Sequence, residues 1–258
     1  MPNHKSLDID QIKESTACGT IHYFESLNST NSWLLEHGQC GDICISESQT
    51  TGRGRRGNNW VSPQGNIYFS LCWCFDEMLE HWSLLGLVTG IAIAEALQDI
   101  GLTSHGVKWP NDIFWQQKKL GGILLETVDQ SGKVIIGIGL NCTLLTDSSK
   151  MIGQPVTSLA EAMNNNVSRD EVITRLIIRL NEKLNSFKRL NFDQFMQSWQ
   201  TWDILRAEQV YFDHQGIEVS GEVVEIDKHG RIGILKNTGE LCFYSSADIR
   251  LRRLKKDM

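Results

Sequence analysis

Residues 50–60 read TTGRGRRGNNW, a stretch that alternates glycine with arginine and has no apolar side chain before the tryptophan. Three of its glycines satisfy the spacing G-x-G-x-x-G, which is typical of dinucleotide-binding folds. That motif must lead directly from a strand into a helix. Here Pro63 and the turn-forming residues around it prevent a helix, and no Gly-Lys-Ser/Thr follows as in a Walker A motif. Both nucleotide motifs are therefore excluded, and residues 50–65 are predicted to be a loop, called the Gly-Arg loop below.

The composition is that of a globular chain with room for one sizeable core and a small second domain. The 258 residues are 41% hydrophobic and 22% charged, with a formal net charge of -6. On an acidic chain, a local arginine cluster indicates a site for a small anion more than a general nucleic-acid surface. The 7 cysteines are scattered and include no C-x-x-C pair, which predicts neither a disulfide framework nor a zinc site and fits a reducing cytoplasm.

No membrane segment is expected. The N-terminus has no apolar run of the kind that a secretory signal requires. The most apolar stretch, at 84–97, is too short to cross a bilayer and is interpreted as a core helix.

Hydrophobic patterns divide the chain into elements. Strands are predicted at 21–27, 42–49, 66–75, 106–117, 119–128 and 133–144. Helices are predicted in 1–20 and at 29–38, 81–101, 168–190 and 192–203. Ser168 and Glu171 form a capping box that starts one of these helices. After residue 206 short alternating strands separated by H-Q-G, K-H-G and N-T-G turns predict a small all-β barrel.

Three interpretations of the Gly-Arg loop remain open on its own sequence. The first is a passive surface loop, and the second is an RGG-like RNA contact, which a single copy on an acidic chain disfavours. The third is a lid, in which arginines close over a phosphate while glycines allow the backbone to order around a ligand. A second cluster of site residues elsewhere in the chain is needed to decide.

Such a cluster lies in VKWPNDIFWQQKKLGGILLE, residues 107–126, where polar groups interrupt an apolar hairpin. Adjacent glycines inside a strand are costly unless another group must approach the backbone closely. IIGIGLN, residues 135–141, repeats this feature with Gly137 and Gly139 on one face. Together with the loop, these segments predict a cleft with a floor of exposed backbone. Its candidate residues are Asn111, Asp112, Lys119, Gly121, Gly122 and Asn141.

In order and approximate spacing, these segments resemble the biotin–protein ligases. The resemblance runs through SLNSTNSWLL (26–35), SESQTTGRGRRGNNW (46–60), GVKWPND (106–112), KLGGILLE (119–126) and IIGIGLN (135–141). It implies an α/β (α+β) fold, with a mixed β-sheet and flanking helices as in class II aminoacyl-tRNA synthetases over residues 1–206. A small SH3-like β-barrel is implied for residues 207–258, and this region is expected to assist the nucleotide or carrier step, with Arg250 turned toward the active site.

The resemblance also implies an activity. Members of the family use ATP to convert biotin into biotinyl-5′-AMP, and then transfer the biotinyl group to one lysine of the biotin carboxyl carrier domain of a carboxylase such as acetyl-CoA carboxylase. Biotin and ATP are thus the expected substrates. Because a carboxylate attacks a phosphate, Lys119, Arg53, Arg55 and Mg²⁺ are expected to offset the charge that develops. No protein ligands to the metal can be assigned from the sequence.

Residue by residue, the resemblance implies two overlapping sets of contacts. The expected biotin-binding residues are Ser29, Thr30, Asn31, Gln49, Arg53, Gly54, Arg55, Lys119, Gly121 and Gly122. The expected ATP or adenylate contacts are Arg53, Arg55, Trp60, Asn111, Lys119 and Asn141. The expected catalytic residues are Lys119, Arg55 and Asp112.

Two departures from the family pattern matter. Asn58 and Asn59 stand where many members carry a further basic residue. The S-T-N motif begins at residue 29, which leaves no room for the DNA-binding domain of the bifunctional members, so we expect a cytoplasmic enzyme that binds neither DNA nor membrane, as a monomer or homodimer. Lipoate–protein ligases are the nearest alternative, and the intact Gly-Arg loop followed by K-W-P-N-D and K-L-G-G disfavours them.

Overall fold

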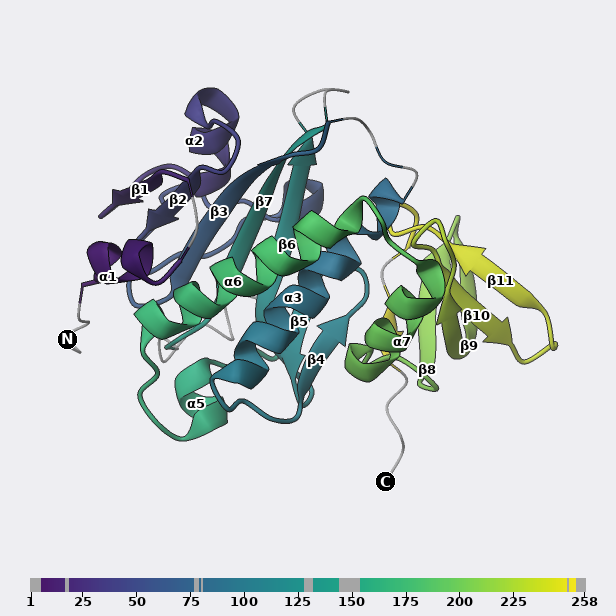
Figure 1. Cartoon of the computed structure of the whole chain (residues 1–258). Helices are drawn as coiled ribbons and strands as arrows, with labels where there is room; N and C mark the ends of the chain where they lie inside the picture. The colour runs from purple at the N-terminus through teal and green to yellow at the C-terminus, as the bar shows by residue number, and fades with distance from the viewer. Residues whose placement is uncertain are drawn as a thin grey trace.

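A mixed seven-stranded sheet forms the centre of the protein (Figure 1). The computed structural model describes residues 6–16, 19–76, 79, 81–127, 132–143, 154–249 and 251–253. The strands lie in the order β1-β2-β3-β7-β6-β5-β4, with β1 and β2 parallel and the other neighbours antiparallel. Their bounds are β1 Ile21–Phe24, β2 Ile43–Ser46, β3 Ile67–Cys74, β4 His105–Lys108, β5 Asp112–Trp115, β6 Lys118–Thr127 and β7 Lys133–Leu140.

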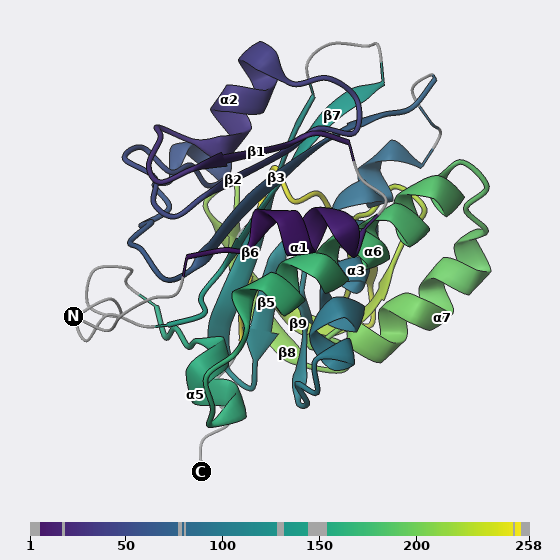
Figure 2. The same cartoon turned by 60° about the vertical axis from the view of Figure 1, so that its left-hand side comes forward.

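Helices cover the two faces of this sheet unequally. The long helices α3 and α6 pack together on one face, whereas α2 contacts β2, β3 and β7 on the other (Figures 1 and 2). Successive residues of a strand point to opposite faces of the sheet, and β2 shows this. Ile43 and Ile45 belong to the large core, whereas Cys44, between them, packs with Leu34 of α2. The described helices are α1 Ile9–Glu14, α2 Thr30–His37, α3 Leu85–Asp99, α5 Leu159–Met163, α6 Arg169–Phe187 and α7 Phe192–Trp202.

Helix ends follow the capping residues in the sequence. Ser29 is the N-cap of α2 and Gly38 is its C-cap, which confirms the helix predicted at 29–38. Ser168 accepts a hydrogen bond from the backbone N–H of Glu171 at 3.3 Å, which confirms the predicted start of α6. The predicted helix at 81–101 is present as the 3-10 turn Trp82–Leu84 followed by α3. Within the described residues, no helix is long and apolar enough to cross a membrane.

A second, antiparallel sheet follows α7, in the order β11-β10-β9-β8-β12. The predicted turns are confirmed, since Gly216, Gly230 and Gly239 adopt φ angles of 81°, 70° and 84° that side chains disfavour. The sheet is joined to the first one near β4, where the Trp109 indole donates to the Gly230 carbonyl at 3.0 Å. Its strands are β8 Gln209–His214, β9 Ile217–Ile226, β10 Ile232–Lys236, β11 Leu241–Tyr244 and β12 Arg252–Arg253.

The predicted strand at 106–117 is wrong in one respect, because it is two strands. The chain reverses at Trp109, Pro110 and Asn111, and β4 then pairs antiparallel with β5. Proline has no N–H to continue the ladder, which accounts for the break. The short helix α5 was also not predicted.

The expectation that the cysteines form no disulfide is wrong for one pair. Cys40 and Cys74 are joined although they lie 34 residues apart in the sequence. The pairing of β2 with β3 explains this, since the Gly41 N–H donates to the Cys72 carbonyl at 2.8 Å and brings the start of β2 to the end of β3. Sequence spacing alone does not reveal such a long-range contact.

Candidate functional site

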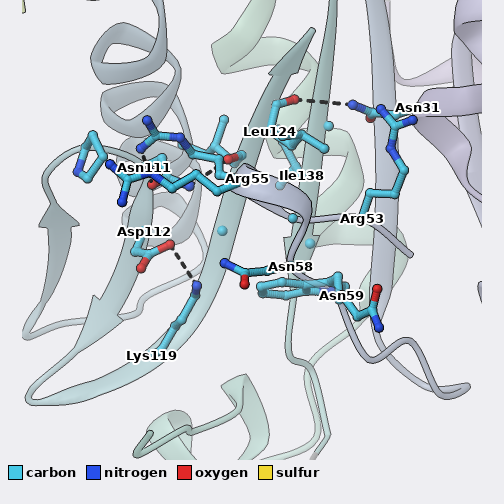
Figure 3. Close-up of a pocket in the computed structure, with 18 of the residues that line it drawn as sticks. Asn31, Arg53, Arg55, Asn58, Asn59, Asn111, Asp112, Lys119, Leu124 and Ile138 are labelled. Carbon is cyan, nitrogen blue, oxygen red and sulfur yellow. Dashed lines mark hydrogen bonds and ion pairs between the residues drawn. The ribbon is translucent and has the colours of Figure 1, made fainter. Parts of the chain in front are cut away.

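A cavity of about 660 Å³ opens on the sheet face that carries α2. Its walls come from the N-terminus of α2, the Gly-Arg loop and the turn between β4 and β5 (Figure 3). Ser246, Ile249 and Leu251, which lie between β11 and β12, complete them. The cavity gathers all but one of the site residues that the sequence predicts. Those that line it are Ser29, Thr30, Asn31, Gln49, Arg53, Gly54, Arg55, Trp60, Asn111, Asp112, Lys119, Gly122 and Asn141.

The floor of the cavity is bare backbone. Gly139 pairs with Gly122 between β7 and β6, and Gly137 lies two residues away on the same face. A Cβ atom at Gly139 would lie 2.6 Å from the Trp60 indole, and one at Gly137 would overlap the amide of Asn31. Glycine is thus required at both positions, which confirms the prediction that they share one face.

Gly121 is the predicted site residue that the cavity does not include. Successive residues of a strand point to opposite faces, so Gly121 and Gly122 cannot both face the cavity. A Cβ atom at Gly121 would lie 2.5 Å from the Leu140 side chain and 2.7 Å from the Gly139 carbonyl. The small size of Gly121 therefore serves packing between β6 and β7.

Lys119 and Asp112 form an ion pair on this floor (Figure 3). Their Nζ and Oδ1 atoms are 2.8 Å apart, and the side chains are 14% and 22% exposed. The backbone of Lys119 is held by residues 155–157, because its N–H donates to Pro155 at 3.0 Å and its carbonyl accepts from Thr157 at 2.9 Å. The ammonium also lies 5.1 Å from the centre of the Trp60 ring, within the range of a cation–π contact. The cavity thus contains a positive charge with a fixed position.

Asn141 ties the same segment to the sheet. Its N–H donates to the Leu120 carbonyl at 2.9 Å, and its side-chain amide donates to the Thr157 carbonyl at 3.0 Å. Its own carbonyl accepts from Leu159 at 2.8 Å, at the start of α5. The predicted nucleotide contact at Asn141 is therefore also a structural anchor for the wall beside Lys119.

A cluster of polar side chains that hydrogen-bond to one another lies at the N-terminus of α2, at the end of the cavity away from Lys119. Gln49 Oε1 accepts from the Thr30 backbone N–H at 2.9 Å. Ser70 Oγ lies 2.7 Å from the Thr30 hydroxyl and 2.6 Å from Asn31 Oδ1. Hydroxyl and amide groups of this kind can both donate and accept hydrogen bonds, so the cluster suits a small polar ring.

The Gly-Arg loop is closed on itself by backbone hydrogen bonds. The Trp60 N–H donates to the Gly52 carbonyl at 2.8 Å, and the Gly54 N–H donates to the Asn58 carbonyl at 2.7 Å. A short 3-10 turn, Arg55–Gly57, forms its tip. The loop places the Trp60 indole over the glycine floor, and its Nε1 atom is buried with no hydrogen-bond partner among the described residues.

Two loop arginines reach to the C-terminal part of the chain. Arg55 donates to Asn111 Oδ1 at 3.1 Å and to the Ser246 hydroxyl at 2.8 Å. Arg56 donates to the Ile249 carbonyl at 3.1 Å. Burial lowers the pKa of Arg55, and the adjacent Arg56 lowers it further. No described carboxylate forms an ion pair with Arg55, so an anion in the cavity would stabilise its charge.

Sequence reasoning missed Ser70, Glu126 and Ser246 as contacts of the site. Ser70 had a signal, because it is a polar residue in the otherwise apolar strand β3. Glu126 lies within a segment that the resemblance includes, but nothing in its spacing singles it out. Ser246 comes from the second sheet, whose position against the loop no local pattern predicts. The expected position of Arg250 lies outside the described residues.

The comparisons with known proteins agree with this geometry. Residues 23–141 match the Biotin/lipoate A/B protein ligase family. The chain is 32% identical to the Bifunctional ligase/repressor BirA of Escherichia coli over 97% of this chain and 79% of that protein. It is 27% identical to the Biotin--[acetyl-CoA-carboxylase] ligase of Mycobacterium tuberculosis over 86% and 85% of the two chains.

Solved structures give the same result. The biotin protein ligase of Aquifex aeolicus, determined in complex with biotin and ATP, aligns with a TM-score of 0.79 and 30% identity. The alignment covers 91% of this chain and 99% of that one. The fold is that of the biotin and lipoate protein ligases. The chain belongs to the biotin protein ligase family.

Proposed function

We propose that this protein is an ATP-dependent biotin–protein ligase. It activates biotin to biotinyl-5′-AMP and transfers the biotinyl group to a lysine of a biotin carboxyl carrier domain, that of acetyl-CoA carboxylase. The observation that carries the proposal is the layout of the cavity, with a polar cluster at one end, a glycine floor, and Lys119 with Arg55 at the other end. The names of the relatives support biotin over lipoate as the acid.

Biotin lies with its ureido ring at the base of α2. Ser29, Thr30 and Asn31 offer hydroxyl and amide groups to the ureido oxygen and nitrogens, and Gln49 holds Thr30 in place. The apolar chain of biotin then runs along the cavity toward Lys119, beside the Trp60 indole that packs on the glycine floor.

Activation requires two anions to meet. A carboxylate oxygen of biotin attacks the α-phosphorus of ATP, the new O–P bond forms, and pyrophosphate leaves with the electrons of the bond that breaks. Lys119 and Arg55 supply fixed positive charge where negative charge develops. Arg53, which was also expected to offset this charge, is instead paired with Glu126 beside Asn31. Trp60, Asn111 and Asn141 line the space for the rest of the nucleotide.

Transfer needs a neutral lysine amine. Asp112 is well placed to accept a proton from the incoming lysine once Lys119 has turned to the acyl phosphate. The amine then attacks the biotinyl carbonyl, an amide bond forms, and AMP leaves. Asn111 fixes the turn beside Asp112 by donating to the Ile123 carbonyl at 2.8 Å.

Magnesium fits this site as a partner of the nucleotide. The described residues contain no cluster of three or more histidine, cysteine or acidic side chains that could hold a metal ion alone. Asp112 is the one carboxylate among the described lining residues, and Mg²⁺ at nucleotide sites commonly uses one or two carboxylates together with phosphate oxygens. When bound, the ion would neutralise charge on the phosphates.

The proposed arrangement has a small C-terminal domain, residues 207–258 with an SH3-like barrel, after a catalytic domain at 1–206. The hydrogen bonds from Arg55 and Arg56 to residues 246 and 249 support a role for this region in closing the Gly-Arg loop. The loop then covers biotinyl-5′-AMP, a mixed anhydride that water would hydrolyse.

One assay tests the function. The protein is incubated with ATP, Mg²⁺, an apo carrier domain and either biotin or lipoate, and the mass of the carrier is measured. A mass increase of one biotinyl group with biotin, and none with lipoate, is expected. Modification with lipoate alone would overturn the proposal in favour of a lipoate–protein ligase.

A further inference from the structure

One carboxylate joins the polar cluster at α2 to the Gly-Arg loop. Asn31 Nδ2 donates to Glu126 Oε2 at 2.9 Å, and the Arg53 guanidinium donates to Oε1 of the same side chain. Figure 3 shows the Arg53 and Asn31 side chains next to each other at this end of the cavity. Glu126 therefore contacts one residue of the polar cluster at α2 and one residue of the Gly-Arg loop.

The position of Glu126 follows from strand alternation. It lies on β6 four residues after Gly122 and two after Leu124, so it points to the cavity face of the sheet. Its side chain is 23% exposed and that of Arg53 is 42% exposed. The ion pair between Arg53 and Glu126 is therefore only partly screened by water. It also differs from an isolated surface pair, because Asn31 is a second donor to the same carboxylate.

The carboxylate also helps to fix the direction of the Asn31 amide. With Nδ2 held by Glu126, Oδ1 of Asn31 faces Ser70 Oγ at 2.6 Å. A carboxylate accepts hydrogen bonds only, so the flipped amide would place two acceptors together. Glu126 and the Leu124 carbonyl, which accepts from the same Nδ2 at 3.4 Å, together determine which group Asn31 presents toward the polar cluster, and the Glu126 hydrogen bond is the shorter of the two.

A second connection reaches the opposite end of the loop. Gln49 donates to the Ser62 hydroxyl at 2.9 Å, and the Ser62 hydroxyl donates to the Trp60 carbonyl at 2.8 Å. Gln49 also accepts from Thr30, the neighbour of Asn31. Both ends of the Gly-Arg loop are therefore linked to the two residues that begin α2, one end through the Glu126 side chain and the other through Gln49.

We propose that Glu126 is a positioning residue that couples recognition of the ring of the substrate to closure of the Gly-Arg loop. It acts through Asn31 on the head group and through Arg53 on the loop, without touching the reacting atoms. The coupling to biotin rests on the proposed function, whereas the attachment of the loop to Glu126 is a property of the unliganded protein. The two parts can be tested separately.

The first test uses Glu126→Gln without any ligand. Glutamine keeps the size and one acceptor but removes the charge, and a charge-assisted hydrogen bond is about twice as strong as a neutral one. Trypsin cleavage within the loop, after Arg55 or Arg56, should become about five- to tenfold faster. Glu95→Gln is the matched control, since Glu95 pairs with Lys183 at 2.6 Å, is 20% exposed, and lies on α3 away from the cavity.

The origin of the faster cleavage is checked with Arg53→Gln. If Glu126 acts through Arg53, Arg53→Gln accelerates cleavage equally and the double variant is no faster than either single one. Arg53→Gln also provides the measurement if Glu126→Gln proves too unstable to purify. Cleavage at the wild-type rate in both variants would overturn the attachment of the loop.

The second test is kinetic. With biotin as the substrate of adenylation, Glu126→Gln should raise KM for biotin about tenfold and leave kcat within about twofold, because an Asn31 amide that is held less firmly weakens substrate binding and not the chemical step. A merely structural role would lower the amount of active enzyme and therefore kcat, with KM unchanged, and that result would overturn the coupling. If the wild type forms no biotinyl-5′-AMP, the proposed function fails, while the proteolysis result still decides whether Glu126 holds the loop.

Discussion

Lys119 and Asp112 neutralise each other on adjacent strands, with 2.8 Å between Nζ and Oδ1. The pairing of Asp112 with Gly122 brings the carboxylate to within reach of a lysine three residues earlier on β6. An anionic substrate that draws Lys119 toward itself would leave Asp112 free to accept a proton. One ion pair thus links the two half-reactions of the proposed function.

Replacing Lys119 with Ala should leave the fold intact and slow adenylation by about 100- to 1,000-fold, the usual effect of removing one electrostatic donor to a transition state. Arg at this position should restore little activity, because a planar guanidinium group does not replace a compact ammonium group. The rate of pyrophosphate release with biotin and ATP measures the effect. Lys118→Ala is the control, since Lys118 pairs with Glu161 and is 43% exposed. Near-normal release from Lys119→Ala would contradict the assigned role.

Arg55→Gly should release the adenylate more than it slows its formation. The hydrogen bonds of Arg55 to Asn111 and Ser246 hold the loop over the cavity, and a charge-assisted contact contributes about 1.5–3 kcal/mol. Its loss should raise the open population by roughly tenfold to a hundredfold. Escaping biotinyl-5′-AMP would then label lysines of a bystander such as serum albumin. Labelling no greater than that by wild type and by the control Arg189→Gly would show that the loop does not retain the intermediate.

Gly139→Ala tests the bare floor. The added Cβ would lie 2.6–2.8 Å from the Trp60 indole, so the ring must move. We expect ATP to bind about tenfold more weakly, because Trp60 forms part of the proposed nucleotide space, and we expect the tryptophan fluorescence to change. Gly86→Ala is the control, since its Cβ would have no neighbour closer than 3.6 Å. Unchanged ATP binding by Gly139→Ala would argue against the assigned position of the nucleotide.

A pH dependence of stability should arise at His105. Burial lowers the pKa of this imidazole, although a hydrogen bond to the Ala94 carbonyl acts in the opposite direction. Nε2 lies 2.8 Å from that carbonyl, and Nδ1 is buried with no partner among the described residues, which favours the neutral ring in the folded state. The unfolded state therefore binds the proton more tightly, and the free energy of unfolding should fall as the pH drops below about 6.5.

Urea unfolding of the wild type and of His105→Gln at pH 7.5 and 5.5 checks this. The variant should lose part of the decrease between the two pH values, because a neutral amide does not titrate. An identical decrease in both proteins would show that His105 does not contribute.

Local chemistry explains which features the sequence predicts. The caps at Ser29 and Ser168 and the glycine turns of the second sheet depend on neighbours within a few residues, and each is present. Strand alternation predicts that Gly137 and Gly139 share a face. The same alternation, applied to Gly121 and Gly122, would have excluded Gly121 from the cavity.

Long-range contacts account for what the sequence does not predict. The bond between Cys40 and Cys74, and the contact of Arg55 with Ser246, join residues that only the folded chain brings together. Glu126 is a further case, because its partners Asn31 and Arg53 come from distant segments. No period or spacing along the chain encodes these distances.

The central claim is that the cavity forms and holds biotinyl-5′-AMP. The most direct measurement incubates the purified protein with biotin, ATP and Mg²⁺ in the absence of a carrier, and identifies the bound small molecules by mass spectrometry. We expect biotinyl-5′-AMP bound to the wild type and little or none with Lys119→Ala. A wild-type protein that binds both substrates but yields no biotinyl-5′-AMP, or that yields lipoyl-AMP when lipoate is supplied instead, would contradict the account.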